Sequence, residues 1–223
     1  CEAARAEFAE SPWLAVVRTA GEARAARTAG KLYAFLAVEG MDAIGTDLEG
    51  IDCYADFGVR LGMLTWNGEN ALAAGAGCDP EQGLTGLGRR AVRRMRERGM
   101  ILDVSHLNRR GFWDALEVSE GAVLASHSNC AALCDVPRNL TDEQLRAIRD
   151  CGGVVGVNSF HGFVHREARQ QTVETLALQF PALYGGPNAR KAVRQEKSLN
   201  YAVKSGIIIP YVQIAAKELK AWK

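Results

Sequence analysis

The chain has 223 residues, of which 48% are hydrophobic and 24% are charged, and its formal net charge is +1 at pH 7. This is the composition of an ordinary globular protein, and a charge so close to zero does not favour nucleic acid or a membrane surface as a partner. We therefore expect no nucleic-acid partner. No apolar run approaches the ~18 residues that a transmembrane helix needs, so we also expect no transmembrane segment.

Apolar runs and amphipathic segments alternate along the chain. Helices are predicted, in chain order, over residues 21–30, about 46–57, 85–99, 108–119 and 141–152. Each is followed by an apolar run short enough for a strand, and these runs cover residues 32–38, 59–65, 100–105, 122–126 and 153–158. Strands that alternate with helices of this length predict βαβ units and a parallel sheet. The runs lack polar alternation, which fits strands buried on both faces.

Polar residues gather where the predicted strands end. The residues at or just after these ends are Glu39, Trp66, His106, His127 and Asn158. In a parallel α/β barrel all such ends face one mouth, so we expect Glu39, His106 and His127 to converge. Histidine nitrogens and a carboxylate oxygen are ligands that suit zinc. Two of the strands stop on Ser-His, which could also serve only to cap the next helix, but its repetition and the acid on a third strand favour the metal site.

Several motifs in this region resemble one known family. The segment 102–148, which contains both Ser-His pairs, resembles the membrane dipeptidase (renal dipeptidase-like) zinc metallopeptidases, as do 38-VEGMD-42, 58-GVRLGMLTWNGEN-70 and 83-GLTGLGRRAVRRM-95. The resemblance covers about residues 10–163. It implies an α/β, amidohydrolase-like fold, which is a distorted (β/α)8 barrel of the TIM type with two zinc ions at its mouth. It also implies hydrolysis of dipeptides.

The resemblance assigns roles to single residues. Glu39 matches the catalytic-site carboxylate that bridges the two metals, and His106 and His127 match the imidazole ligands of the second metal. Arg138, in 136-VPRNL-140, matches the arginine that holds the C-terminal carboxylate of the substrate, a task that suits the planar fork of a guanidinium group. Trp66 stands where some members carry a substrate-binding histidine. Asn158, at another strand end, completes the predicted substrate-binding set.

Two motifs of the family are missing from the sequence. The first metal is held partly by a His-x-Asp pair on the first strand, and an acid lies in a Gly-x-Asp-Phe-Asp-Gly-like segment on the last strand; neither occurs here. We therefore expect one zinc ion per chain and a partial (β/α)8 barrel that lacks its first and last strands. The edges of an unclosed sheet can pair with other chains, so a homo-oligomer is one expectation. His161 and His165 follow the last predicted strand and are either replacement ligands or ordinary loop histidines.

The composition changes after residue 163. From residue 188 to the end, eight Lys or Arg and two Glu give 8 − 2 = +6. We expect a partial dipeptidase barrel over residues 1–163 and a basic helical tail over residues 164–223. Three interpretations of the tail are open: an unrelated terminus, an element that covers an open sheet edge, or a basic surface.

Three functions are open at this point. The first is zinc-dependent hydrolysis of dipeptides, with a dipeptide as the small-molecule partner. The second is a catalytically inactive remnant that binds one metal, and the third is another metal-dependent hydrolase of the amidohydrolase type. The compartment is open as well, between the cytoplasm and a lipid anchor, since Cys1 is either the lipidated end of a processed lipoprotein or the result of truncation, which is the simpler account.

Overall fold

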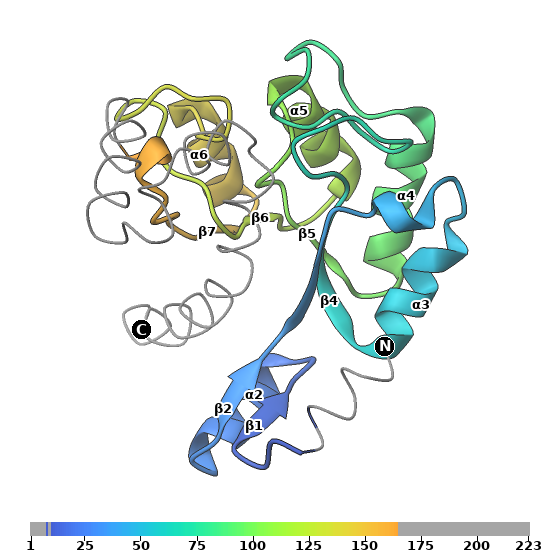
Figure 1. The fold of residues 1–223 in the computed structure, drawn as a ribbon, viewed down its shortest axis with the longest axis vertical. Coiled ribbons are helices and arrows are strands. Elements are labelled where there is room, and N and C mark those ends of the chain that lie inside the picture. Colours follow the sequence, from blue (N-terminus) through green and yellow to red (C-terminus); the bar gives the residue numbers. More distant parts are fainter. Residues whose placement is uncertain (1–7, 9, 165–223) are drawn as a thin grey trace, which may run out of the picture. The chain divides into compact units, whose positions relative to one another are not determined.

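A computed structural model of the chain describes residue 8 and residues 10–164, which form a mixed α/β fold (Figure 1). The chain divides into two compact units, Cys1–Asn158 and Ser159–Lys223. The described residues of the second unit include the short 3-10 helix η2 (His161–Phe163), where the rings of Phe160 and Phe163 pack edge to face. No helix in the described part of the chain is long and apolar enough to cross a membrane.

All strand pairs are parallel, and neighbouring strands follow one another in the chain. A two-stranded sheet is formed by β1 (Leu14–Val16) and β2 (Leu32–Ala34). A three-stranded sheet has the order β3 (Leu36–Glu39), β4 (Val59–Met63), β5 (Ile101–Leu102). A second pair is formed by β6 (Leu124–Ala125) and β7 (Val154–Val155). One isolated parallel bridge, from Asp103 to Leu124, joins the end of β5 to β6.

Helices provide the connections between these parallel strands. In chain order they are α2 (Ala20–Thr28), the 3-10 helix η1 (Asp42–Ile44), α3 (Glu49–Phe57), α4 (Gly86–Glu97), α5 (Arg109–Ser119) and α6 (Asp142–Asp150). The side chains of Thr85, Asn108 and Thr141 cap α4, α5 and α6 by accepting a hydrogen bond from a backbone N–H in the first turn. These caps satisfy donors that the helix itself leaves without partners.

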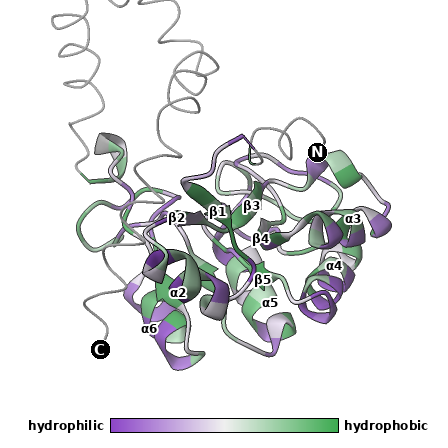
Figure 2. Cartoon of the chain, turned by 90° about the horizontal axis from the view of Figure 1, so that it is seen from below, coloured by the Kyte–Doolittle hydropathy of each residue, from purple (hydrophilic) through white to green (hydrophobic). Residues whose placement is uncertain are grey.

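One hydrophobic core lies between the helices and the strands. Its fully buried side chains come from every part of the first unit after β3, and include Met41, Ile51, Leu64, Leu72, Met95, Val104, Phe112, Val123 and Ile148. A separate small cluster of Val17, Ala23 and Ala26 packs under β1 and β2. Figure 2 shows hydrophobic residues along β3 and hydrophilic residues along much of α4. Arg94 of α4 pairs with Asp52 of α3 at 2.7 Å, so the charged surface also joins neighbouring helices.

Most predicted elements are confirmed in position. The five predicted helices are present, and each predicted strand position contains a strand, although the strands are shorter than expected. The ladder stops early after β5 because the backbone N–H of Ser105 bonds to the side chain of Asp103 and not to a neighbouring strand. The boundary at residue 163 stays a prediction, because the expected tail lies outside the described residues apart from Val164.

Two details of the strand prediction were wrong. The expected single strand over residues 32–38 is divided at Phe35 into β2 and β3, which pair with different neighbours and belong to different sheets. The additional strand β1 was not predicted, because three apolar residues, Leu14–Val16, are too short a run to show periodicity.

Candidate metal centre

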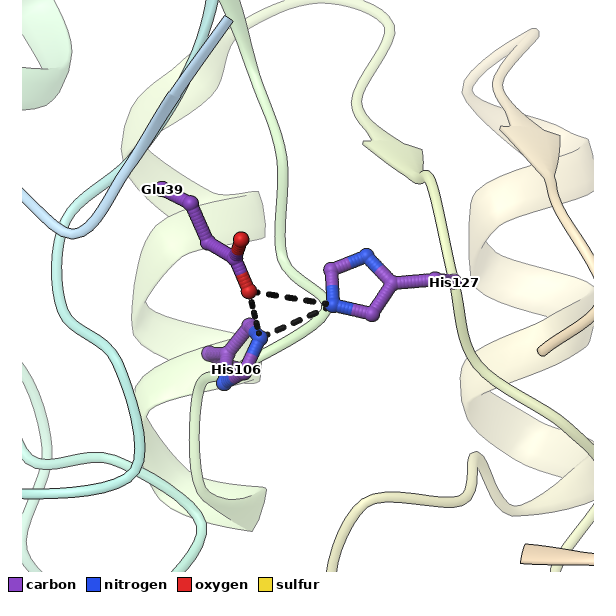
Figure 3. A group of neighbouring side chains, drawn as sticks. All are labelled: Glu39, His106 and His127. Carbon is purple, nitrogen blue, oxygen red and sulfur yellow. Dashed lines mark hydrogen bonds and ion pairs between the residues drawn. The ribbon is translucent and has the colours of Figure 1, made fainter. Parts of the chain in front are cut away.

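Three potential ligand atoms meet at the carboxyl ends of β3, β5 and β6 (Figure 3). Nε2 of His106 lies 2.8 Å from Nε2 of His127 and 3.0 Å from Oε1 of Glu39. Nε2 of His127 lies 3.7 Å from the same carboxylate oxygen. Within the described residues, no other group of three or more His, Cys, Asp or Glu side chains converges in this way. The structure therefore brings together the three residues that the strand ends predict.

These separations fit the donor set of a tetrahedral metal ion. Zinc binds imidazole nitrogen and carboxylate oxygen at roughly 2.0–2.2 Å, so two of its tetrahedral ligand atoms are about 3.3 Å apart. The three measured separations, 2.8, 3.0 and 3.7 Å, lie around that value. The residues present can thus hold one such ion.

The partners of His106 show which of its ring nitrogens carries the lone pair. Its Nδ1 lies 3.0 Å from Oδ1 of Asn67, which accepts a hydrogen bond. Its Nε2 lies 3.1 Å from a guanidinium nitrogen of Arg138, which can only donate. The contacts with Asn67 and Arg138 therefore favour a proton on Nδ1 and a lone pair on Nε2, the nitrogen that faces Glu39 and His127. Such a fixed tautomer is characteristic of histidines that bind metals.

The electrostatics of the group favour one carboxylate and two neutral rings. The adjacent ring of His106, as the first cause, and the indole N–H of Trp66 lower the pKa of Glu39 to about 2. Burial, with the positive charge of Arg138 as the next cause, lowers the pKa of His127 to about 3, and burial also lowers the pKa of His106. At neutral pH the three atoms that face one another are therefore electron-pair donors, which repel one another unless a cation lies among them.

Trp66 contacts two of the three candidate ligands. Its indole N–H donates to Oε1 of Glu39 at 3.2 Å, and its ring stacks on His106 with centroids 5.8 Å apart and an angle of 30° between the planes. The side chain of Glu39 is 46% exposed and that of His106 is 5% exposed, so solvent reaches the group from the side of Glu39.

The other two predicted substrate-binding residues lie close to the group. Arg138 is buried, and besides His106 its guanidinium contacts the carbonyl oxygen of Ser105. Asn158 donates from Nδ2 to the carbonyl oxygen of His127 at 3.4 Å, and its backbone N–H donates to Oδ1 of Asn129 at 2.8 Å. The contacts of Asn158 thus hold the segment after β7 against the segment after β6.

Sequence reasoning missed the residues that support the ligands. Asn67 lies beside His106, Ser105 and Ser126 contact His127, and Asp103 accepts from the backbone N–H of Ser126. A signal for the serines was present in the repeated Ser-His pair, which was interpreted through its histidines alone. Of the two alternative ligands, His165 lies outside the described residues, and of His161 only the backbone, in η2, is described.

Comparison with known proteins identifies the family. The model of the membrane dipeptidase family (Peptidase family M19) matches residues 2–183. The chain belongs to the membrane dipeptidase family. The match extends beyond the expected range of about 10–163 at both ends, so the expectation that the resemblance stops near residue 163 was wrong.

Proteins similar to this chain appear among curated proteins and solved structures. An uncharacterized protein in the pqqA 5′ region of Klebsiella pneumoniae is 41% identical over 151 residues, which are 64% of this chain and 55% of that protein. The uncharacterized dipeptidase C965.12 of Schizosaccharomyces pombe is 36% identical over 144 residues, 63% of this chain and 35% of its own length.

A metallo peptidase from Rhodobacter sphaeroides, solved with a phosphinate mimic of the dipeptide L-Ala-D-Ala, superposes with a TM-score of 0.68 at 34% identity. That match covers 74% of this chain and 48% of the other. The chain spans about half the length of the first curated relatives it matches, 55% and 48%.

Proposed function

We propose that this chain carries a metal site and the substrate-carboxylate arginine of a zinc-dependent dipeptidase, on part of a (β/α)8 barrel. The observation that carries the proposal is the convergence of Glu39, His106 and His127 at the ends of β3, β5 and β6, with all ligand atoms within 4.8 Å of one another. Parallel strands that pair in chain order support the barrel. Family membership and the similarity to a metallo peptidase that was solved with a dipeptide mimic support the reaction.

Each residue of the group has a distinct proposed role. Glu39, His106 and His127 hold the metal, which when bound supplies Lewis acidity and makes water a nucleophile near neutral pH. Trp66 restrains Glu39 through its indole N–H and forms one wall of the site. Asn158 keeps the segment after β6 in place through the carbonyl of His127.

Arg138 is the proposed receptor for the C-terminal carboxylate of the dipeptide. Its guanidinium contacts His106, one of the three candidate ligands, at 3.1 Å, and a substrate bound by both would therefore have its peptide bond near the metal. The guanidinium fork can bind both oxygens of a carboxylate at once. Because Arg138 is buried, that ion pair would form in a poorly solvated site, where charge attraction is stronger than in bulk water.

A second function, a protein that binds one metal without cleaving peptides, is favoured by a different observation. The described residues contain one ligand group, and the sequence lacks the His-x-Asp pair of the first family metal. Both proposed functions predict one zinc ion per chain, but only the dipeptidase function predicts hydrolysis of dipeptides.

The test combines metal content with hydrolysis. The full chain is loaded with zinc, dialysed, and assayed for zinc by mass spectrometry. We expect one zinc per chain, lost in His106→Ala and in His127→Ala but retained in the control His161→Ala/His165→Ala. Retention of zinc in both ligand variants would refute the ligand assignment.

The same preparation is then offered L,L- and L,D-dipeptides, a cyclic amide and a phosphoester. Cleavage of dipeptides alone supports the first function, cleavage of another substrate supports a different amidohydrolase reaction, and zinc binding without cleavage supports the second function.

A further inference from the structure

The serines that precede the two histidines meet beneath them on one buried carboxylate. Oδ1 of Asp103 accepts hydrogen bonds from the backbone N–H of Ser105 at 3.0 Å, from its hydroxyl at 2.7 Å, and from the backbone N–H of Ser126 at 3.1 Å. Asp103 is 1% exposed. It lies at the point where one bridge connects β5 to β6, between the strand that leads to His106 and the strand that leads to His127.

The two serine hydroxyls connect this carboxylate to His127. Oγ of Ser105 accepts a hydrogen bond from the backbone N–H of His127 at 3.1 Å. Oγ of Ser126 lies 2.7 Å from Nδ1 of the His127 ring and 3.5 Å from Oγ of Ser105. The backbone and the ring of His127 are therefore both held by side chains that Asp103 organises.

The number of protons on the two hydroxyl groups limits which group can donate in each hydrogen bond. A serine hydroxyl has one proton to donate. That of Ser105 is committed to Asp103, so in any bond between the two hydroxyls Ser126 is the donor. When Ser126 donates across this 3.5 Å contact, it can only accept from the ring, and the arrangement that satisfies all three side chains has the proton of His127 on Nδ1, which donates to Ser126 at 2.7 Å. The lone pair of His127 is thus on Nε2, the nitrogen that faces Glu39 and His106.

We propose that Asp103 is a positioning residue, which acts through the hydroxyls of Ser105 and Ser126 to hold His127 in the tautomer that presents a lone pair at Nε2. The inference rests on the proposed function only in assigning a use to that lone pair, which is to bind the metal. It extends the known arrangement in which a carboxylate orients a metal-binding histidine, here with a hydroxyl between the two.

A purely structural role, joining β5 to β6, is the competing explanation. A second buried carboxylate, Asp114, shows what such a role looks like in this chain. Asp114 accepts from the backbone N–H of Leu84 at 3.0 Å and pairs with the guanidinium groups of Arg89 and Arg110, each at 3.0 Å. Its burial is compensated by two positive charges.

Asp103 lacks compensation of that kind. Its second oxygen, Oδ2, is buried without a hydrogen-bond partner in the described part of the chain. Burial raises the pKa of this carboxyl group, which the hydrogen bonds from Ser126 and Ser105 oppose. A buried carboxylate without a neighbouring cation is costly to stability. Asp103 lies between the two strands that lead to His106 and His127, so the loss of stability from its burial is consistent with a role in positioning these histidines.

The experiment reads the tautomer of His127 directly in the metal-free full chain. Long-range proton–nitrogen NMR of the imidazole rings distinguishes protonated from unprotonated ring nitrogens, and the His127 signals are assigned by their loss in His127→Ala. We expect a protonated Nδ1 and an unprotonated Nε2 in the unaltered chain. Ser126→Ala, which removes only a hydroxyl, and Asp103→Leu, which removes the carboxylate at similar volume, should both populate the form protonated on Nε2.

Asp114→Leu is the matched control, because it also removes a buried carboxylate and should leave the His127 tautomer unchanged. A shift in all three variants would mean that general destabilisation is the cause, and would overturn the inference. A shift in Ser126→Ala but not in Asp103→Leu would also overturn it, since Ser126 would then act alone. If Asp103→Leu does not fold, an unchanged tautomer in Ser126→Ala still refutes the network.

Zinc titration separates this inference from the proposed function. If both hold, Ser126→Ala and Asp103→Leu weaken zinc binding by about 10- to 100-fold, as loss of such supporting groups does elsewhere. If the unaltered chain binds no zinc but the tautomer shifts as expected, the proposed function fails and the positioning role stands. If zinc binds and the tautomer is the same in all variants, the positioning role fails and the proposed function stands.

Discussion

Trp66 donates its indole N–H to the carboxylate of Glu39, 27 positions earlier in the chain, at 3.2 Å. The bond holds the most exposed of the three candidate ligands against the other two. A carboxylate with 46% of its side chain exposed would otherwise sample several rotamers, and metal binding would have to restrict them. An aromatic residue at this position can therefore preorganise the ligand group as well as form a wall for a substrate.

Replacing Trp66 with phenylalanine tests this role. Trp66→Phe keeps a ring over His106 but removes the donor to Glu39, so we expect zinc binding to weaken by about fivefold, which corresponds to ~1 kcal/mol for one hydrogen bond. Calorimetric titration with zinc measures it. Trp113→Phe, at an exposed tryptophan on α5, is the control and should bind zinc normally. Equal affinities in the two variants would show that the indole N–H is dispensable.

The metal-free chain should become less stable as the pH falls, because His127 is buried in its neutral form. The pKa of His127 is lowered from 6.5 to about 3, so below pH 6.5 the unfolded chain binds a proton that the folded chain does not. The resulting stability is present above pH 6.5 and is lost as the pH falls from there toward 3. Glu39, with its pKa lowered to about 2, acts in the same direction below pH 4.5.

Urea denaturation between pH 8 and pH 5 measures this effect. The free energy of unfolding should fall with pH in the unaltered chain and fall less steeply in His127→Ala, which has lost the buried ring. A steeper dependence in His127→Ala would contradict the assignment of His127 as buried and neutral.

Arg138 should strengthen the binding of dipeptides that have a free C-terminal carboxylate. Arg138→Lys keeps the positive charge but loses the planar fork, so binding of a dipeptide to the zinc-loaded chain should weaken by about 10- to 100-fold, or ~1.5–3 kcal/mol. Binding of the corresponding dipeptide amide, which has no carboxylate, should be weak and the same in both proteins. An equal loss for both ligands would indicate that the substitution disturbs His106 or Ser105, which Arg138 also contacts.

The cap of α6 offers a test of the fold away from the metal centre. The hydroxyl of Thr141 accepts from the backbone N–H of Gln144, whose side chain accepts in return from the backbone N–H of Thr141. Thr141→Ala should lower the free energy of unfolding by about 1 kcal/mol, while Thr141→Ser should retain most of it. Zinc affinity should be the same in both variants. A large loss of affinity in Thr141→Ala would mean that α6 supports the ligand group.

The candidate ligands could be predicted from sequence because of how parallel strands are built. Glu39, His106 and His127 each follow a short apolar run, and the carboxyl ends of successive parallel strands necessarily meet. The helices could be predicted for a similar reason, since Thr85, Asn108 and Thr141 mark their starts by local capping chemistry. Both signals are contained within a few neighbouring residues.

The supporting residues could not be predicted in this way, because their roles depend on distant partners. Asn67 meets the ring of His106 from 39 positions away, and Asp103 meets the backbone of Ser126 from 23 positions away. The division of one apolar run at Phe35 depends likewise on which neighbouring strand each half meets. No local pattern encodes such choices.

The single bridge between Asp103 and Leu124 has a mechanical consequence. His106 follows a strand of the three-stranded ladder and His127 follows a strand of the two-stranded ladder, and this bridge is the ladder contact that joins them. Any ion that binds both rings is therefore a cross-link between two separately hydrogen-bonded parts of the sheet. Its binding free energy would also resist the shearing of one part past the other, so hydrogen exchange in β6 and β7 should slow when the ion is bound.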